Sequence, residues 1–254
     1  MRTVVTVAVP RRTQLAIFLR LLAIQASWNF ETMLGNGMGF CIEPALRLLP
    51  GGVDSDAYRA ALARQSQYFN ANPYLASVAV GALARAELEG EAPERIERFR
   101  TALCGPLGSV GDQLVWAALL PGCSLAALAV YGWGAGAATT LLAFLGLYNV
   151  VTLALRAWGL RAGLREGTGV AQSLGAPFLR QGPHVIGGMA ALLAGVGLPL
   201  AVQRIVDHGG AVLGGTLIAI AISGALLARL HGRADGWKLA LVAQVAFILY
   251  WAVK

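Results

Sequence analysis

The carboxy-terminal part of the chain consists of long apolar runs separated by short polar or glycine-rich stretches. The runs are residues 113–131, 137–155, 184–203, 211–228 and 237–253. An α-helix rises ~1.5 Å per residue and needs about 20 apolar residues to cross ~30 Å of hydrocarbon, so each run approaches the length of a spanning helix. The first two runs are predicted to form a hairpin that turns at Gly132-Trp133-Gly134.

The amino-terminal part alternates apolar and polar stretches more closely. Residues 13–30 are apolar but contain Arg20, which predicts an amphipathic or interfacial helix. Residues 54–69 have helical periodicity with a polar face, and Asp54 or Ser55 could cap that helix. Residues 73–84 are apolar but too short to span a bilayer, which favours a re-entrant segment. The charged stretch that follows, up to residue 100, must contact water.

Together these patterns predict an all-α polytopic membrane protein with amphipathic and re-entrant helical segments. We expect two parts: residues 1–104, with amphipathic and short re-entrant helices, and residues 105–254, a membrane part with about five apolar segments. Pro121 and the frequent glycines indicate that some apolar runs are broken or re-entrant.

The composition agrees with a membrane protein. Of 254 residues, 57% are hydrophobic and only 13% are charged, whereas a soluble domain carries about 25% charged residues. The 32 glycines fit closely packed membrane helices. The net charge of +7 comes from scattered basic residues without a basic stripe, which argues against a nucleic-acid-binding protein.

The basic residues also predict an orientation. They cluster before the first run, between the second and third, and between the fourth and fifth. These residues are Arg95, Arg98, Arg100, Arg156, Arg161, Arg165, Arg180, Arg229, Arg233 and Lys238. The positive-inside rule places them in the cytoplasm, with the amino terminus. Five spans would then leave the carboxy terminus outside.

No catalytic, metal-binding or cofactor-binding motif is found, and no such group is predicted. The sequence has no P-loop, no His-Glu-x-x-His and no Gly-x-Ser-x-Gly. Its three cysteines are far apart and indicate neither a disulfide framework nor a zinc site. A phosphoryl-accepting role is possible in principle for His184, His208 or His231, but isolated positions at run edges favour interfacial histidines.

Residues 104–112 (CGPLGSVGD) are the most distinctive local stretch. A loop is predicted here from three glycines and a proline, Gly105, Pro106, Gly108 and Gly111. Within the same stretch, Ser109 and Asp112 form a helix-capping signal before an apolar run. One interpretation is a tight loop that caps a membrane helix. The other is a loop at membrane depth, where its free amides and Asp112 line a polar cavity.

Residues 67–74 (QYFNANPY) combine amides with aromatic rings. The side chains of Asn70 and Asn72 can donate and accept hydrogen bonds, as sugar hydroxyls require, and sugar ring faces pack on aromatic rings. The alternative, favoured from these residues alone, is that Asn-Ala-Asn-Pro simply initiates a turn. Trp28 and Asn29 are equally ambiguous, because an interfacial tryptophan is common in membrane proteins.

Several ordered motifs resemble one known family. They are residues 25–33 (QASWNFETM), 39–49 (GFCIEPALRLL), 68–73 (YFNANP), 105–116 (GPLGSVGDQLVW) and 148–167 (YNVVTLALRAWGLRAGLREG). In this order and spacing, over roughly residues 14–190, they resemble the IID component of the mannose–fructose–sorbose family of the bacterial phosphotransferase system (PTS).

The resemblance implies a noncatalytic membrane subunit in the bacterial inner membrane. With a IIC subunit it would form the channel for a mannose-type hexose, while soluble IIA and IIB components carry the phosphoryl group, and the complex would be a trimer of C–D pairs with a mobile core. The candidate substrate-binding residues are Asn70, Asn72, Asp112, Gln67, Trp28 and Asn29.

The chain also departs from the family pattern. Gln65 and Gln67 stand where the family has His and Glu, Asn72 stands where it has His or Gln, and the loop after residue 203 is short. These departures leave the identity of the sugar open. They also leave open a purely structural subunit that supports IIC, or an orphan regulatory protein; an unrelated transporter would have to carry the ordered motifs by chance.

Overall fold

The computed structural model describes the backbone of residues 8–230 and the side chains of residues 8–207. Within residues 8–230 all regular elements are helical, and the only β-type pairing consists of isolated bridges around Met33. In chain order the elements are α1 (Arg11–Leu21), α2 (Gly35–Leu46), η1 (Gly52–Asp54), α3 (Asp56–Gln65), α4 (Ala76–Leu88), α5 (Pro93–Gly111), the π-helical η2 (Asp112–Leu119), α6 (Leu120–Gly132), α7 (Ala137–Glu166), η3 (Gly167–Gly175) and α8 (Pro177–Leu230). The predicted all-α class is confirmed.

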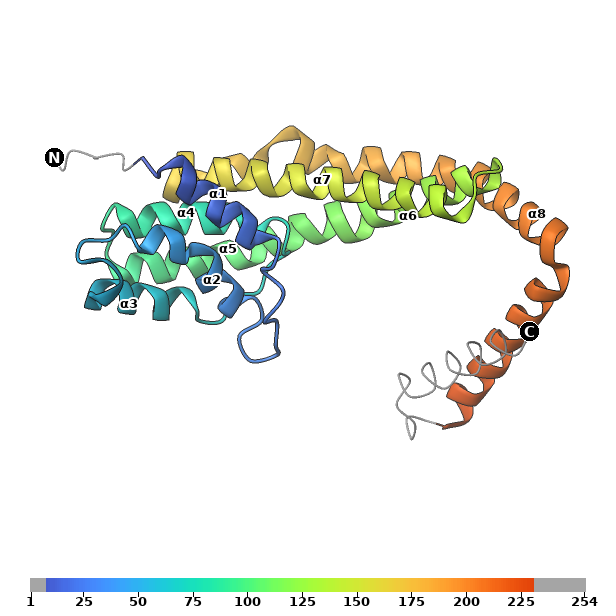
Figure 1. Ribbon diagram of the computed structural model, residues 1–254, viewed down its shortest axis with the longest axis horizontal. Helices are drawn as coiled ribbons and strands as arrows, with labels where there is room; N and C mark the ends of the chain where they lie inside the picture. The colour runs from blue at the N-terminus through green and yellow to red at the C-terminus, as the bar shows by residue number, and fades with distance from the viewer. Residues whose placement is uncertain (1–7, 231–254) are drawn as a thin grey trace. The chain divides into compact units, whose positions relative to one another are not determined.

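Compact packing divides the chain at Leu198–Pro199 into two units. Within the first unit, α1 to α5 form a bundle, and α6 and α7 extend from it side by side (Figure 1). Helix α5 runs without interruption through residues 104 and 105, where the sequence suggested a boundary between two parts. That division into an amino-terminal part and a membrane part stays a prediction.

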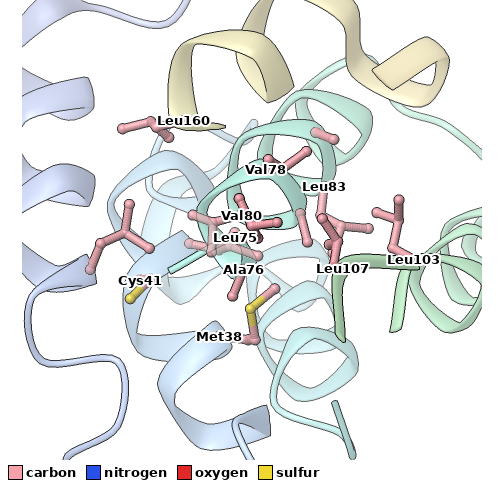
Figure 2. Close-up of a cluster of buried hydrophobic side chains, with 14 of the residues drawn as sticks. Met38, Cys41, Leu75, Ala76, Val78, Val80, Leu83, Leu103, Leu107 and Leu160 are labelled. Atoms are coloured by element: carbon pink, nitrogen blue, oxygen red, sulfur yellow. The ribbon is translucent and has the colours of Figure 1, made fainter. Parts of the chain in front are cut away.

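Helix α4 is the centre of the bundle. It packs against α2, α5, α7 and η3, and nearly all its side chains are buried. Figure 2 shows Leu75, Val78, Val80 and Leu83 of this region surrounded by side chains of other helices. Those labelled from its neighbours are Met38, Cys41, Leu103, Leu107 and Leu160. The run at 73–84 is therefore short because its apolar surface is covered by protein on all sides and does not have to span lipid.

Glycines allow α4 and α7 to touch backbone to backbone. A Cβ atom added at Gly163 would lie 2.3 Å from the carbonyl oxygen of Val78, and one added at Gly81 would lie 2.6 Å from that of Leu160. At Gly159 the added atom would lie 2.3 Å from Oγ of Ser77. No side chain fits at these positions, so the two helices hold a spacing that only glycine permits.

Three helical stretches within the described residues are long and apolar enough to cross a membrane: 93–132, 137–175 and 177–207. The predicted runs 113–131 and 137–155 are confirmed as helices, joined by a tight turn in which Gly134 adopts φ +105°. Leucines on the outer surface of α7, such as Leu141 and Leu142, are more than half exposed, as expected for contact with lipid or a partner.

The expected break between runs 184–203 and 211–228 is absent, because both lie in α8. No proline interrupts residues 200–230, and Gly209 and Gly210 each cost a helix only about 1 kcal/mol relative to Ala. Run 237–253 and its flanking Arg233 and Lys238 lie outside the described residues.

Two other predicted boundaries are corrected. The helix predicted over 13–30 ends at Leu21, because residues 22–34 form turns. Asn29 organises these turns: its side-chain oxygen accepts hydrogen bonds from the backbone NH groups of Glu31 and Thr32, at 2.9 Å each. Arg156, Arg161 and Arg165, assigned to a cytoplasmic loop, lie within α7, and Arg156 is buried.

A carboxylate with three partners ties the first three helices together. Glu43 of α2 accepts hydrogen bonds from Arg20 of α1 (2.7 Å), from Arg47 just after α2 (2.5 Å) and from the hydroxyl of Tyr58 of α3 (2.9 Å). Burial alone would raise the pKa of Glu43, but the hydrogen bonds from Arg47, Tyr58 and Arg20 together hold it below its usual value of 4.5. The ionised form is therefore the one the fold favours.

The glycine contact predicts the effect of a single methyl group. Gly163→Ala should destabilise the protein by about 1–3 kcal/mol, because the methyl forces apart two helices that touch through their backbones. The measurement is thermal unfolding of the purified protein in detergent. Gly146→Ala on the same helix is the matched control, since nothing lies within 4 Å of its added Cβ, and it should be neutral or stabilising. Equal effects of the two substitutions would contradict the packing described.

The Glu43 cluster predicts a pH dependence of stability. Because the folded-state pKa is lowered, the stabilisation is present above the usual value of 4.5 and is lost as pH falls through the folded-state pKa. Glu43→Gln should thus melt at a lower temperature than the wild type at neutral pH, and the difference should shrink below pH 4.5. The control is Asp56→Asn on exposed surface of α3. A difference that persists unchanged through the acid range would contradict this assignment.

Candidate functional site

An open cleft of about 590 Å³ lies beside the amino-terminal bundle. Three segments form its wall: the turn after α1, the segment between α3 and α4, and the face formed by α5 and η2. The lining residues are Gln25, Trp28, Tyr68, Asn70, Ala71, Pro73, Cys104, Gly105, Gly108, Ser109, Asp112 and Trp116. Amides, a carboxylate, a hydroxyl and three aromatic rings thus face one space.

The α5–η2 wall is one stripe of a helix. Cys104, Gly108, Asp112 and Trp116 are four residues apart and therefore stack along one face. The adjoining face, which includes Leu103, Leu107, Leu114 and Val115, is buried in the core. The apolar face of this helix packs in the protein core, and its more polar face lines the cleft.

Residues 104–112 are therefore helical, which corrects the predicted loop. Pro106 lies inside α5, and Gly105 and Gly108 expose helix surface to the cleft instead of shaping a turn. Ser109 does not cap a helix start, because α5 passes directly into η2. From Asp112 onward the hydrogen bonding is π-helical, and such segments recur at functional sites.

Arg100 fixes the segment between α3 and α4 from beneath. Its guanidinium donates to the carbonyl oxygens of Tyr68 (2.8 Å), Gln65 (3.2 Å) and Gln67, and it lies 5.2 Å from the ring centre of Phe69. Arg100 is only 5% exposed, so its guanidinium hydrogen-bonds backbone carbonyl oxygens inside the protein and not water or a ligand. The side chains of Tyr68 and Asn70 consequently emerge from a rigid backbone.

Asn72 links this segment to Asp112. Its amide nitrogen donates to a carboxylate oxygen of Asp112 at 2.9 Å, and its amide oxygen accepts from the backbone NH of Tyr74 at 3.1 Å. The approach depends on Gly111, where an added Cβ would lie 2.3 Å from the Cβ of Asn72. Asn72 is buried and does not line the cleft itself, but it orients the carboxylate of Asp112, which does.

Aromatic residues continue inward from the cleft. Trp116 meets the ring of Tyr74 edge to face at 5.5 Å, and the hydroxyls of Tyr74 and Tyr148 lie 2.8 Å apart. The guanidinium of Arg156 lies over the ring of Tyr74, 4.3 Å from its centre. These contacts fix Tyr74 and, through it, the base of the cleft.

The structure brings together some predicted residues and separates others. Trp28, Asn70 and Asp112 line one cleft, although they are distant in sequence. Asn29 forms its hydrogen bonds within its own turn, and the exposed Gln67 donates to the carbonyl oxygen of Ala63 in the preceding helix at 3.4 Å; neither lines the cleft. Gln65 is buried and donates to Glu87 at 2.7 Å, which gives it a packing role.

Several lining residues escaped the sequence reasoning. Gln25, Tyr68 and Trp116 lie inside the quoted motifs but were not singled out, and Ser109 was considered only as a helix cap. The i, i+4 spacing of Asp112 and Trp116 is the signal that could have found Trp116. His184 lies exposed on α8, while the side chains of His208 and His231 are outside the described part. No group of three or more potential metal ligands occurs among the described residues.

The cysteines should report on the cleft. Burial raises the pKa of the Cys41 thiol to about 12, so it stays protonated and inert, and Cys123 is also buried. Cys104 is half-buried and lines the cleft. A maleimide reagent should therefore label Cys104 first at mildly alkaline pH, as measured by peptide mass spectrometry. Cys104→Ser is the control and should remove the fast phase; fast labelling at Cys41 would contradict the burial described.

The fold and cleft define a class: a polytopic helical membrane protein with a polar, aromatic-lined cleft beside its spanning helices. Residues 8–205 match the family described as PTS system mannose/fructose/sorbose family IID component. The chain belongs to this family, and it is a subunit of a bacterial PTS sugar transporter of the mannose family.

Individual relatives agree. The chain is 32% identical over 210 residues to the mannose-specific EIID component of Escherichia coli strain K12, which covers 76% of this chain and 72% of that protein. It is 32% identical over 214 residues to the sorbose-specific EIID component of Klebsiella pneumoniae, covering 78% and 76% of the two chains. It is 29% identical over 213 residues to the fructose permease IID component of Bacillus subtilis, covering 78% and 75%.

Solved structures share the fold. One is a chain of the mannose transporter ManYZ in complex with microcin E492, with a TM-score of 0.58, 22% identity, and 97% of each chain covered. Another, described as a membrane protein, has a TM-score of 0.64 and 23% identity, covering 96% of this chain and 97% of that one.

Proposed function

We propose that this chain works with a IIC subunit to bind and translocate a mannose-type hexose, and that its cleft contributes part of the sugar path. The observation that carries the proposal is the meeting of Asn70, Asp112 and aromatic rings at one cleft. Amide and carboxylate groups can hydrogen-bond hydroxyls, while Trp28, Tyr68 and Trp116 offer flat apolar faces for a sugar ring.

The side chains of the cleft are held in place before a ligand binds, which favours a sugar-binding site over an ordinary solvent-filled cleft. Asn72 holds Asp112 through one oxygen, and Arg100 fixes the backbone beneath Tyr68, so two recognition groups keep their positions before a ligand arrives. Such rigid placement lowers the entropic cost of binding. Gln67, included among the candidates by sequence, has no part in this arrangement.

In this proposal the chain is noncatalytic, because the phosphoryl group reaches the sugar from soluble IIA and IIB components. The open side of the cleft would be closed by the IIC subunit, and the exposed apolar surface of α7 provides contact area for that partner or for lipid. We further propose a trimer of C–D pairs in the inner membrane, as the family resemblance implies, and a cytoplasmic amino terminus, as the positive-inside rule predicts.

The decisive measurement is phosphoenolpyruvate-dependent sugar phosphorylation in membranes containing this chain, its IIC partner and the soluble components. Asn70→Ala and Asp112→Asn should each lower activity roughly tenfold or more, since hydrogen bonds to charged or preorganised groups contribute about 1.5–3 kcal/mol. Asp112→Asn removes the charge while keeping an acceptor for Asn72. Gln67→Ala is the matched control and should retain activity.

Copurification with the IIC partner distinguishes the alternatives. Full assembly with lost activity supports a sugar-contacting cleft. Normal activity in both variants would overturn it and favour a noncatalytic scaffold, as would activity losses that merely follow losses of assembly. Stable assembly without any phosphorylation by the wild-type complex would point to an orphan regulatory subunit.

A further inference from the structure

A second cleft, of about 540 Å³, shares no lining residue with the first. It lies where α1 packs on the carboxy-terminal part of α7; the two helices can be followed in Figure 1. Three arginines line it: Arg85 of α4, and Arg161 and Arg165 of α7. Guanidinium groups at one cleft repel each other, and an anion bound between them would offset that repulsion. Nothing in the proposed sugar path uses these residues.

The arginines differ in their roles. Arg85 is committed to the protein: it pairs with Glu89 at 2.7 Å and donates to the carbonyl oxygens of Leu164 and Arg165 at the end of α7. It also packs against Gly167, whose φ of +55° and close neighbours exclude a larger residue. Arg85 thus builds the wall of the cleft without being free to bind a ligand through all its donors.

Arg161 and Arg165 are exposed and available. Among the described side chains neither forms an ion pair, although six such pairs are formed elsewhere. The nearest acid along α7, Glu166, accepts instead from the hydroxyl of Ser173 at 2.6 and 2.7 Å. Arg161 and Arg165 therefore present guanidinium groups that form no ion pair among the described side chains and that suit a phosphate.

An apolar groove continues from this cleft. It has a volume of about 290 Å³ and is lined by Gln14, Leu15, Phe18, Ala157, Leu160 and Arg161. Gln14 and Arg161 belong to both the groove and the basic cleft, so the two spaces adjoin. Leu15 and Leu19 of α1 are more than half exposed next to a helix able to span a membrane.

We propose that this site binds an anionic phospholipid, with the headgroup phosphate at Arg161 and Arg165 and an acyl chain along the groove between α1 and α7. A phosphate alone would need only the basic cleft, and a water-soluble phosphoprotein would leave the apolar groove unfilled. The lipid fits both halves, and basic pockets at the ends of membrane helices are suited to such headgroups. Helix α1 then lies at the membrane interface as an amphipathic anchor.

The test is lipid binding to the full chain in neutral detergent, counted by native mass spectrometry. Dioleoyl phosphatidylglycerol should bind well above dioleoyl phosphatidylcholine, which has the same tails but no net charge. The double substitution Arg161→Gln with Arg165→Gln should weaken phosphatidylglycerol binding roughly thirtyfold, given two basic groups near a headgroup. Arg59→Gln with Arg98→Gln removes the same charge from exposed positions elsewhere and should leave affinity unchanged.

A further variant separates lipid from free phosphate. Leu15→Gln should weaken phosphatidylglycerol binding while leaving that of soluble glycerol phosphate unchanged, because only the lipid uses the groove. Three results would overturn the proposal. The wild type could bind the two lipids with equal affinity, or the two double arginine variants could lose phosphatidylglycerol binding equally. In the third result, the Arg161 and Arg165 double variant would still bind the lipid but would no longer bind a phosphorylated soluble PTS component. The comparison of the two lipids on the wild type decides the matter even where a variant fails to fold.

Discussion

The direct contact between the backbones of α4 and α7 is the constraint on which the remainder of the first compact unit depends. Gly81, Gly159 and Gly163 remove the side chains that would separate the helices, so α4 lies enclosed while α7 continues as a candidate span. The backbone NH of Ala76, the first residue of α4, donates to the carbonyl oxygen of Asn72 at 2.8 Å, so the position of α4 also determines where the cleft residues stand. Helix packing and the cleft are thus consequences of one interface.

Much of this arrangement could be predicted from the sequence, because length and apolarity are local properties. The runs at 113–131 and 137–155 and the turn at Gly132-Trp133-Gly134 follow from them directly. The segment 104–112 was misjudged because glycine and proline commonly break helices in water. Here its buried stripe, with Leu107 and Gly111, supplies packing energy that outweighs the weak propensity. Propensity measures the isolated chain, whereas the helix is stabilised by its neighbours.

The sequence predicted only part of the candidate sugar cleft. Asn70 and Asp112 were identified by residue type, but the separation of Asn72 from the cleft depends on a hydrogen bond across 40 residues, which no local pattern records. The roles of the arginines were still harder to predict from the sequence. The positive-inside rule counts Arg100 and Arg156 as cytoplasmic charges, yet both are buried: Arg100 donates to carbonyl oxygens and Arg156 lies over an aromatic ring. A charge in the sequence does not state which side of a helix it occupies.

The π-helical segment η2 has a consequence for how this protein tolerates changes in chain length. A π-helical turn, with its i→i+5 hydrogen bonds, holds about one residue more than an α-helical turn. Deleting one residue between Asp112 and Leu119 would therefore let the segment close with ordinary α-helical bonding and leave α6 close to its present orientation relative to α5. The same deletion inside α7 would turn every later residue of that helix by roughly 100°. The chain can thus lose a residue within η2 with little change beyond it, whereas a loss in α7 would reach surfaces far from where it occurs.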